Sequence, residues 1–214
     1  PVSGYTNTYT NNGQITGEIF ILMRDIDYAF NFGHIGKLSL DTINTASDNR
    51  KCTLLNNLSV SSISLTSSHL TYTLTLDLNG HNLTTASITV STRGILQCGN
   101  GTITTSSLDS SAGTITPETA TWVFEGNGAA KVSAAQKLRS VLVKDRLKLL
   151  SNLGIEQALA HTNPIDLNGF ALTLDRPENE YTSIRRPMVR AIRKLDLGPT
   201  GALDRWMTEL GGVI

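Results

Sequence analysis

Four acidic residues in the first two thirds of the chain are candidates for acid–base chemistry: Asp77, Asp109, Glu118 and Glu125. Two carboxylates on one face of a site can cleave a glycosidic bond, one as the acid and one as the base or nucleophile. Asp77 alternates with a row of leucines, so it is expected on the opposite, solvated face of its strand. The sequence therefore predicts no catalytic residue, although these four remain the ones to test for polysaccharide cleavage.

The four histidines are His34, His69, His81 and His161, and no two of them lie at a metal-ligand spacing. The chain also lacks the HExxH, GxSxG, P-loop and GxGxxG motifs. We therefore expect neither a metal site nor a bound cofactor, and we expect the chain not to be an enzyme.

The chain has two cysteines, Cys52 and Cys98, and neither has a CxxC partner. Cys98 lies in an apolar strand position, where a buried free thiol is the usual state. A Cys52–Cys98 disulfide stays open, because spacing alone does not decide whether two cysteines meet.

Charge is divided unevenly along the chain. Residues 1–130 hold five basic and nine acidic side chains, a net charge of −4, and residues 131–214 carry +4. The strongest charge feature is a basic run near the C-terminus, made of Arg185, Arg186, Arg190, Arg193 and Lys194. Such a run is more often a solvated helix face than a contact for phosphate or an acidic partner. No aromatic residues interleave with it, which argues against a groove for single-stranded nucleic acid.

The stretch 74–104 carries two copies of one pattern. In each copy an apolar alternating run leads to Asn-Gly, first at Asn79-Gly80 and then at Asn100-Gly101. Asn-Gly supplies positive φ and turns the chain. Further Asn-Gly pairs begin at residues 12, 127 and 168. A drifting period of about 20–30 residues is typical of a solenoid, in which stacked coils bury apolar rows that one coil cannot bury alone.

The sequence LTLDLNGHNLT, followed by ITVSTRGILQCGNGTIT, resembles right-handed parallel β-helix repeats of the pectate-lyase-like superfamily. The resemblance covers about residues 70–104 and has a weaker echo at 165–175. It implies a parallel solenoid. That superfamily includes lyases, hydrolases, bacterial surface proteins and phage tailspikes, so the resemblance leaves function open. No set of acids or arginines matches the family's catalytic residues, and none is carried over.

After residue 130 the apolar spacing suggests helices. Ser133 and Gln136 form a capping-box pattern, and Gly154 is a suitable helix end. We therefore predict an amphipathic helix over residues 134–153, a short helix over 155–161, a strand over 165–175, and helices over 187–197 and 201–210. The apolar face of the first helix is made of Leu138, Val141, Leu142, Leu149 and Leu153, and Val143, Leu147 and Leu150 widen it.

The predicted organisation has three parts. Residues 1–50 form an N-terminal arm with a capping strand, of which 33–50 is loop; residues 51–130 form the solenoid-like region; residues 131–214 form a helical region with one strand. The expected fold class is thus mainly β with C-terminal helices, built on a short parallel β-helix. Two ordinary hairpins in an antiparallel sandwich or barrel are the alternative, because Asn-Gly is also a hairpin signal.

We expect a structural virion protein of a phage: a capsid decoration, tail or fibre component that acts through oligomer assembly, as a trimer that also binds other virion proteins. The candidate interface residues are Leu138, Leu142, Leu149, Arg185, Arg186, Arg190 and Trp206. No secretory signal or membrane-length apolar run occurs, so we expect assembly in the host cytoplasm and residence in the virion. The alternative is a carbohydrate-binding or polysaccharide-degrading module, in which Trp122 and the tyrosines stack on sugars.

Overall fold

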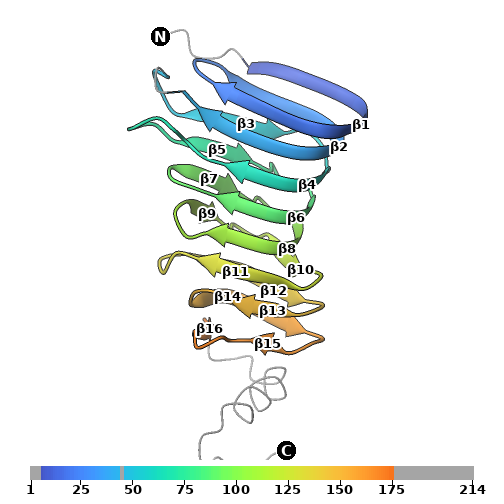
Figure 1. Cartoon of the computed structure of the whole chain (residues 1–214), viewed down its shortest axis with the longest axis vertical. Helices are drawn as coiled ribbons and strands as arrows, with labels where there is room; N and C mark the ends of the chain where they lie inside the picture. The colour runs from blue at the N-terminus through green and yellow to red at the C-terminus, as the bar shows by residue number, and fades with distance from the viewer. Residues whose placement is uncertain (1–5, 44–45, 176–214) are drawn as a thin grey trace, which may run out of the picture. The chain divides into compact units, whose positions relative to one another are not determined.

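A computed structural model describes residues 6–43 and 46–175, and every regular element in this part of the chain is a β-strand. The strands pair in parallel and wind into a β-solenoid of about eight coils (Figure 1). They are β1 (Thr6–Met23), β2 (Asp27–Thr42), β3 (Arg50–Leu54), β4 (Leu58–Leu65), β5 (Leu74–Asp77), β6 (Leu83–Val90), β7 (Gly94–Gln97), β8 (Thr102–Ser110), β9 (Thr114–Thr116), β10 (Thr121–Phe124), β11 (Gly128–Val132), β12 (Lys137–Val143), β13 (Leu147–Leu149), β14 (Leu153–His161), β15 (Ile165–Asp166) and β16 (Leu172–Leu174). The parallel solenoid predicted from the repeat is confirmed, and the antiparallel alternative is wrong.

Each coil contributes three strand segments, and equivalent segments of successive coils form three stacks. Stack A contains β3, β5, β7 and β9. Stack B contains the first halves of β4, β6 and β8, followed by β10 and the second halves of β12 and β14. Stack C contains the second halves of β4, β6 and β8, followed by β11, β13 and β15. The long strand β2 runs through all three stacks.

The coils change in length along the chain, and those that follow β2 become shorter toward the C-terminal end. Leu58 pairs with Leu83, and Leu83 in turn pairs with Ile103, which is a smaller step in sequence. Near the C-terminal end Ser140 pairs with Ala158, and the step is smaller again. The drifting period predicted from the sequence therefore reflects corners of changing length between strands that stay in register.

Alternation within each strand builds the interior. Every second side chain of a strand points the same way, so residues in register form inward columns that stack along the solenoid. The column of stack C runs through Leu38, Ile63, Ile88 and Leu108, each at most 2% exposed. Stacking on both sides is what buries these side chains, since each strand by itself is only a few residues long.

Asn-Gly pairs form two of the corners. Asn79 and Gly80 both have positive φ, at 50° and 77°, and the His81 amide donates to the Leu78 carbonyl oxygen, which defines a type I′ turn. Asn168-Gly169 repeats this geometry after β15. Type I′ turns usually close hairpins, but here the strands on either side pair with neighbouring coils instead of with each other.

Asparagine side chains continue the hydrogen-bonded ladder through one corner. The Asn82 amide donates to Asn57 Oδ1 at 2.9 Å, and the Thr102 amide donates to Asn82 Oδ1 at 2.8 Å. Each side chain thus satisfies a backbone donor of the next coil where strand pairing stops.

Stack A is interrupted once. β9 pairs with β7 on one edge, and among the described strands it has no partner on the other, where the start of β12 would continue the stack. Gln136 crosses this break: its Nε2 donates to the Gly113 carbonyl oxygen, and its Oε1 accepts from the Ser110 hydroxyl at 3.0 Å. The side chain supplies hydrogen bonds that a strand pair supplies elsewhere.

The helix predicted over residues 134–153 is wrong, because this stretch forms β12 and β13. Leu138, Val141, Val143, Leu147 and Leu149 are all buried. Their intervals are three residues at the register shift inside β12, four residues between β12 and β13, and two residues elsewhere. That mixture imitates the helical period. The expected capping box is a tight turn, in which the Gln136 amide donates to the Ser133 carbonyl oxygen.

Other expectations change accordingly. Residues 155–161 belong to β14 instead of a helix, and β2 occupies much of the stretch 33–50 that was expected to be loop. The strand over 165–175 is confirmed as β15 and β16, joined by the Asn168-Gly169 corner. The fold class is therefore all β in the described residues, and the helices expected over 187–197 and 201–210 lie outside them.

Candidate functional site

The four candidate acids form no hydrogen bond with one another, although Asp77 and Glu118 both lie beside Gln97. Asp77 was expected on a solvated face but is buried, at 8% exposed. It forms an ion pair with Lys51 Nζ at 2.5 Å and accepts a hydrogen bond from the Asn79 amide at 2.7 Å. Glu118 accepts a hydrogen bond from Gln97 Nε2 at 2.8 Å. Both carboxylates hold corners of the solenoid, and each is engaged with a neighbouring residue.

The other two acids lie in other parts of the coil. Burial raises the pKa of Asp109, but hydrogen bonds from Ser111 and the charge of Lys131 outweigh this effect, so the pKa lies below its ordinary value. Glu125, which directly follows β10, pairs with Lys144 Nζ at 3.4 Å. None of the four acids pairs with another acid as an acid–base couple requires.

Histidine and cysteine chemistry is equally sparse in the described residues. No group of three His, Cys, Asp or Glu side chains there could hold a metal ion. His34 Nδ1 lies 3.3 Å from Ser59 Oγ, but the two belong to the flat outer surface of stack B. Cys52 and Cys98 are both free and buried, and burial strongly raises the pKa of each thiol. The disulfide that the sequence left open is not formed.

Trp122, the residue expected to stack on sugars, is fully buried and packs beside Phe124 with ring centroids 6.4 Å apart. A side chain on the inside of the solenoid cannot meet an external glycan. The carbohydrate-binding alternative therefore loses its main contact residue.

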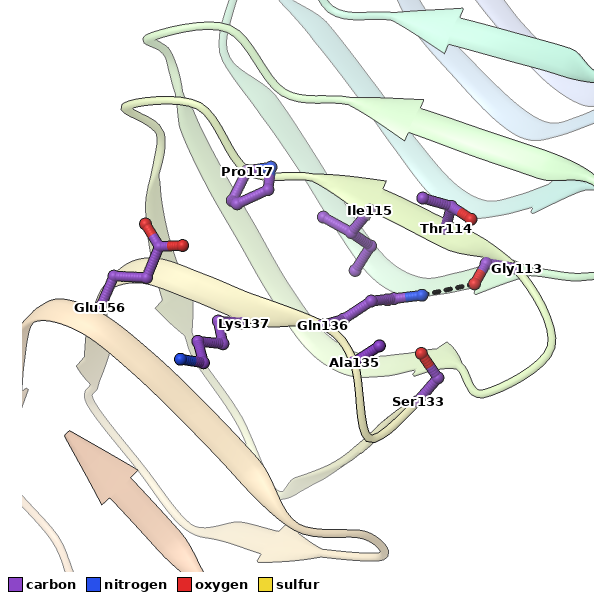
Figure 2. Close-up of a pocket in the computed structure, with 9 residues that line it drawn as sticks. All are labelled: Gly113, Thr114, Ile115, Pro117, Ser133, Ala135, Gln136, Lys137 and Glu156. Atoms are coloured by element: carbon purple, nitrogen blue, oxygen red, sulfur yellow. Dashed lines mark hydrogen bonds between the residues drawn. The ribbon is translucent and has the colours of Figure 1, made fainter. Parts of the chain in front are cut away.

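A hollow of about 370 Å³ lies at the interruption of stack A (Figure 2). Gln136 crosses it toward Gly113, while Lys137 and Glu156 lie at its rim. Lys137 forms an ion pair with Asp175, and the Asp175 carboxylate is the main cause of its raised pKa. Glu156 is the one acid that lines the hollow, so the hollow offers no carboxylate pair.

The residues predicted to form an interface lie in different environments. Leu138 and Leu149 are 0% exposed and belong to the core, so they cannot meet a partner. Leu142 points outward from β12 and is half-buried. The remaining interface candidates lie outside the described residues: Arg185, Arg186, Arg190 and Trp206.

Strand β1 forms one end of the described solenoid. It pairs with β2 from Thr6 to Met23, with two interruptions, and its other edge has no partner among the described strands (Figure 1). Exposed edge strands usually carry lysine, proline or inward charges that prevent association. β1 has 18 residues with no lysine and no proline, and Glu18 is its one charged residue. We call this strand with its open side the β1 edge.

Apolar side chains are concentrated at the β1 edge. Among the seven large hydrophobic residues that are exposed in the described chain, three lie in β1: Tyr9 at 47%, Phe20 at 59% and Leu22 at 50%. Phe20 and Leu22 point outward, because their register partners Ser39 and Asp41 lie on the outer row of β2. Exposed apolar patches of this kind mark association sites.

Glu18 does little to protect the β1 edge. Its carboxylate lies 3.0 Å from Lys37 Nζ and accepts a hydrogen bond from the Ser39 hydroxyl at 2.7 Å. The Ser39 hydrogen bond is the main cause of its lowered pKa, followed by Lys37. The charge is therefore balanced within the chain.

The β1 edge was not predicted from the sequence. Residues 1–50 were expected to form an arm with one capping strand, whereas two long strands, β1 and β2, lie in this stretch and face different neighbours. No sequence signal marks it, because the outward placement of Phe20 and Leu22 follows from the register of β1 with β2.

Comparison of the chain with protein-family models, with curated proteins and with solved structures finds no match. A separate search of the described residues finds no helix with the length and apolar character needed to cross a membrane.

Proposed function

We propose that this chain is a structural building block that works by binding further subunits through the β1 edge. The single observation that carries the proposal is that edge: 18 residues of strand with one open side, outward Phe20 and Leu22, and one balanced charge. A strand with these properties gains hydrogen bonds and apolar burial when another strand is added.

The setting we propose is a virion, where the chain would serve as a capsid decoration, tail or fibre component and contact other virion proteins. The support for this setting is the resemblance of residues 70–104 to repeats that also occur in phage tailspikes, together with the dispersed acids, which favour a structural role over a catalytic one. Its partners would be copies of itself and neighbouring particle proteins.

Light scattering on the purified chain, measured across micromolar concentrations, tests the association. We expect a mass above that of one chain, which falls when Phe20 and Leu22 are both replaced by serine. Serine replacement of Leu55 and Leu70, which are also exposed but lie in corners, is the matched control and should leave the mass unchanged. A monomer at all these concentrations that also fails to bind particles would contradict the proposal.

A further inference from the structure

The straight part of β1 that follows its last irregularity is suited to pairing with a copy of itself. Register shifts separate Asn11 from Gln14 and Ile15 from Glu18, whereas Glu18–Met23 pairs with β2 without interruption. In this segment Ile19, Ile21 and Met23 point into the solenoid, and Glu18, Phe20 and Leu22 point outward.

We infer that two copies of the chain join end to end, with Glu18–Arg24 of one β1 edge antiparallel to the same segment of the other and Ile21 on the two-fold axis. This inference rests on the proposed function and names the partner at the β1 edge. The contact it describes is a two-fold pair and differs from the trimer expected from the sequence. A two-fold interface requires a surface that complements itself, and this segment does so.

The side-chain pattern selects the register. Inward residues must face inward residues, because a slip of one residue would place Ile19 and Ile21 on the solvated side. With Ile21 opposite Ile21 of the second copy, the outward residue Phe20 faces the partner's Leu22. Both exposed apolar side chains are then covered by each other.

The same register pairs opposite charges. Glu18 faces the partner's Arg24, an exposed residue immediately after β1, and the pair occurs twice in the dimer. Glu18 already contacts Lys37 at 3.0 Å and Arg24 contacts Asp25 at 3.1 Å, so the new pair would join two existing ion pairs into one network of alternating charge. Moving the axis to Phe20 would instead place the Glu18 carboxylate against Leu22, and moving it to Leu22 would place Phe20 against Arg24. The register centred on Ile21 is the one that matches apolar with apolar and acid with base.

The second copy is favoured as the occupant because this edge is low in charge and complements itself. Cross-strand apolar pairs and opposite-charge pairs each stabilise antiparallel strands. The inward side chains of the first coil, Ile19 and Ile21, would then continue directly into the interior of the second copy, so that the two solenoids share one core.

Cysteine substitution along β1 tests the register. We expect Ile21→Cys to form a disulfide between two chains under mild oxidation, because a residue on the two-fold axis faces its own copy. Phe20→Cys and Leu22→Cys should each cross-link poorly alone but efficiently when the two variants are mixed. The native thiols of Cys52 and Cys98 are buried, so the unsubstituted chain should give little background.

Charge reversal tests the pairing without cysteine. Glu18→Lys and Arg24→Glu should each weaken the dimer about tenfold, since two like-charge pairs replace two opposite-charge pairs, and the double variant should restore it. Glu125→Lys is the matched control, because Glu125 also pairs with a lysine at a similar distance but lies away from β1. A merely structural role for Glu18 would give no rescue.

The outcomes separate this inference from the proposed function. Efficient cross-linking at Phe20→Cys alone would overturn this register and leave assembly through the β1 edge intact. An oligomer that no β1 variant changes would overturn both the pairing and the proposed role of the β1 edge. A chain that stays monomeric, binds no particle and forms no cross-link would overturn both.

Discussion

The first coil and the middle coils of this solenoid use the same inward isoleucines with different results. Ile19 in β1 is half-buried, whereas Ile63 in β4 and Ile88 in β6, which occupy the same column of stack C, are 2% and 1% exposed. The local alternation is alike in all three strands. The difference shows that full burial of this column comes from having a neighbouring coil on both sides.

The largest expected effect comes from placing a charge inside a middle coil. Leu138→Asp should unfold the chain, at a cost of about 4 kcal/mol or more, because the carboxylate would be buried without a partner. Leu142→Asp, in the same strand but pointing outward, is the matched control and should leave the unfolding free energy within about 0.5 kcal/mol of the parent. Chemical denaturation measures both.

If Leu138→Asp and Leu142→Asp lowered the free energy of unfolding equally, the strand would be contradicted. The result would favour the helix predicted from the sequence, in which Leu138 and Leu142 share a face. The same experiment thus tests the correction to the fold class. It also tests whether Leu142 contributes to an interface, since its replacement would then change the mass without changing the fold.

Replacing one isoleucine of a middle coil and one of the first coil by alanine compares the packing of the two coils directly. Ile63→Ala should cost about 2–5 kcal/mol, as expected for a buried aliphatic side chain that leaves a cavity. Ile19→Ala should cost about 1 kcal/mol in the monomer, because part of its surface is already in water. Denaturation at low and high protein concentration would show a larger loss for Ile19→Ala at high concentration, where a second copy covers it.

If Ile19→Ala and Ile63→Ala lowered the free energy of unfolding equally in dilute solution, the contrast between the first and middle coils would be contradicted. It would mean that the first coil is as well packed as the middle coils without any partner.

The sequence was most informative where each coil is regular. Leu74, Leu76 and Leu78 alternate as a strand requires, and Asn79-Gly80 turns the chain with the positive φ that was predicted for it. The second copy shifts by one residue, because Gly99, and not Asn100, adopts positive φ. Such local features can be predicted from the sequence because they depend on residues that are adjacent in the chain.

Features that depend on neighbouring coils could not be predicted from the sequence. Strands β12 and β13, with short corners between them, produce an apolar spacing close to that of a helix, and only the stacking on β10 and β14 decides between the two. The β1 edge was missed for the same reason: Phe20 and Leu22 look like core residues until the first coil is known to lack a neighbour on one side. No local pattern distinguishes an end coil from a middle one.

A smaller effect is expected at the interruption of stack A, where β9 also has a neighbour on one side. Gln136→Ala removes two hydrogen bonds, to Gly113 and from Ser110, and should cost about 1–2 kcal/mol. Gln157→Ala is the matched control, since Gln157 is exposed and accepts from Arg139 at 3.2 Å, and it should cost less than about 0.5 kcal/mol. A negligible effect of Gln136→Ala would show that the interrupted stack needs no bridge.

The smallest effect concerns Asp109, which lies in a middle coil beside Lys131 of the next one. Its pKa lies below the ordinary value because the Ser111 hydrogen bonds and the charge of Lys131 outweigh the effect of burial. Ser111→Ala removes the hydroxyl contact and should raise the Asp109 pKa, as followed by carboxyl-carbon NMR in an acid titration. Thr114→Ala is the matched control, because it removes an exposed hydroxyl a little further along the chain and should leave that pKa unchanged.

The sign for stability follows from this shift. A carboxyl group whose pKa is lower in the folded chain stabilises it above the unfolded pKa, and this contribution is lost as the pH falls through the folded pKa. Ser111→Ala brings the two pKa values closer, so the variant should lose part of that contribution and unfold at a slightly higher pH than the parent. An unchanged Asp109 titration would mean that contact with Lys131 of the adjacent coil, and not the local serine, holds the carboxylate. The influence of a neighbouring coil would then extend from packing to charge.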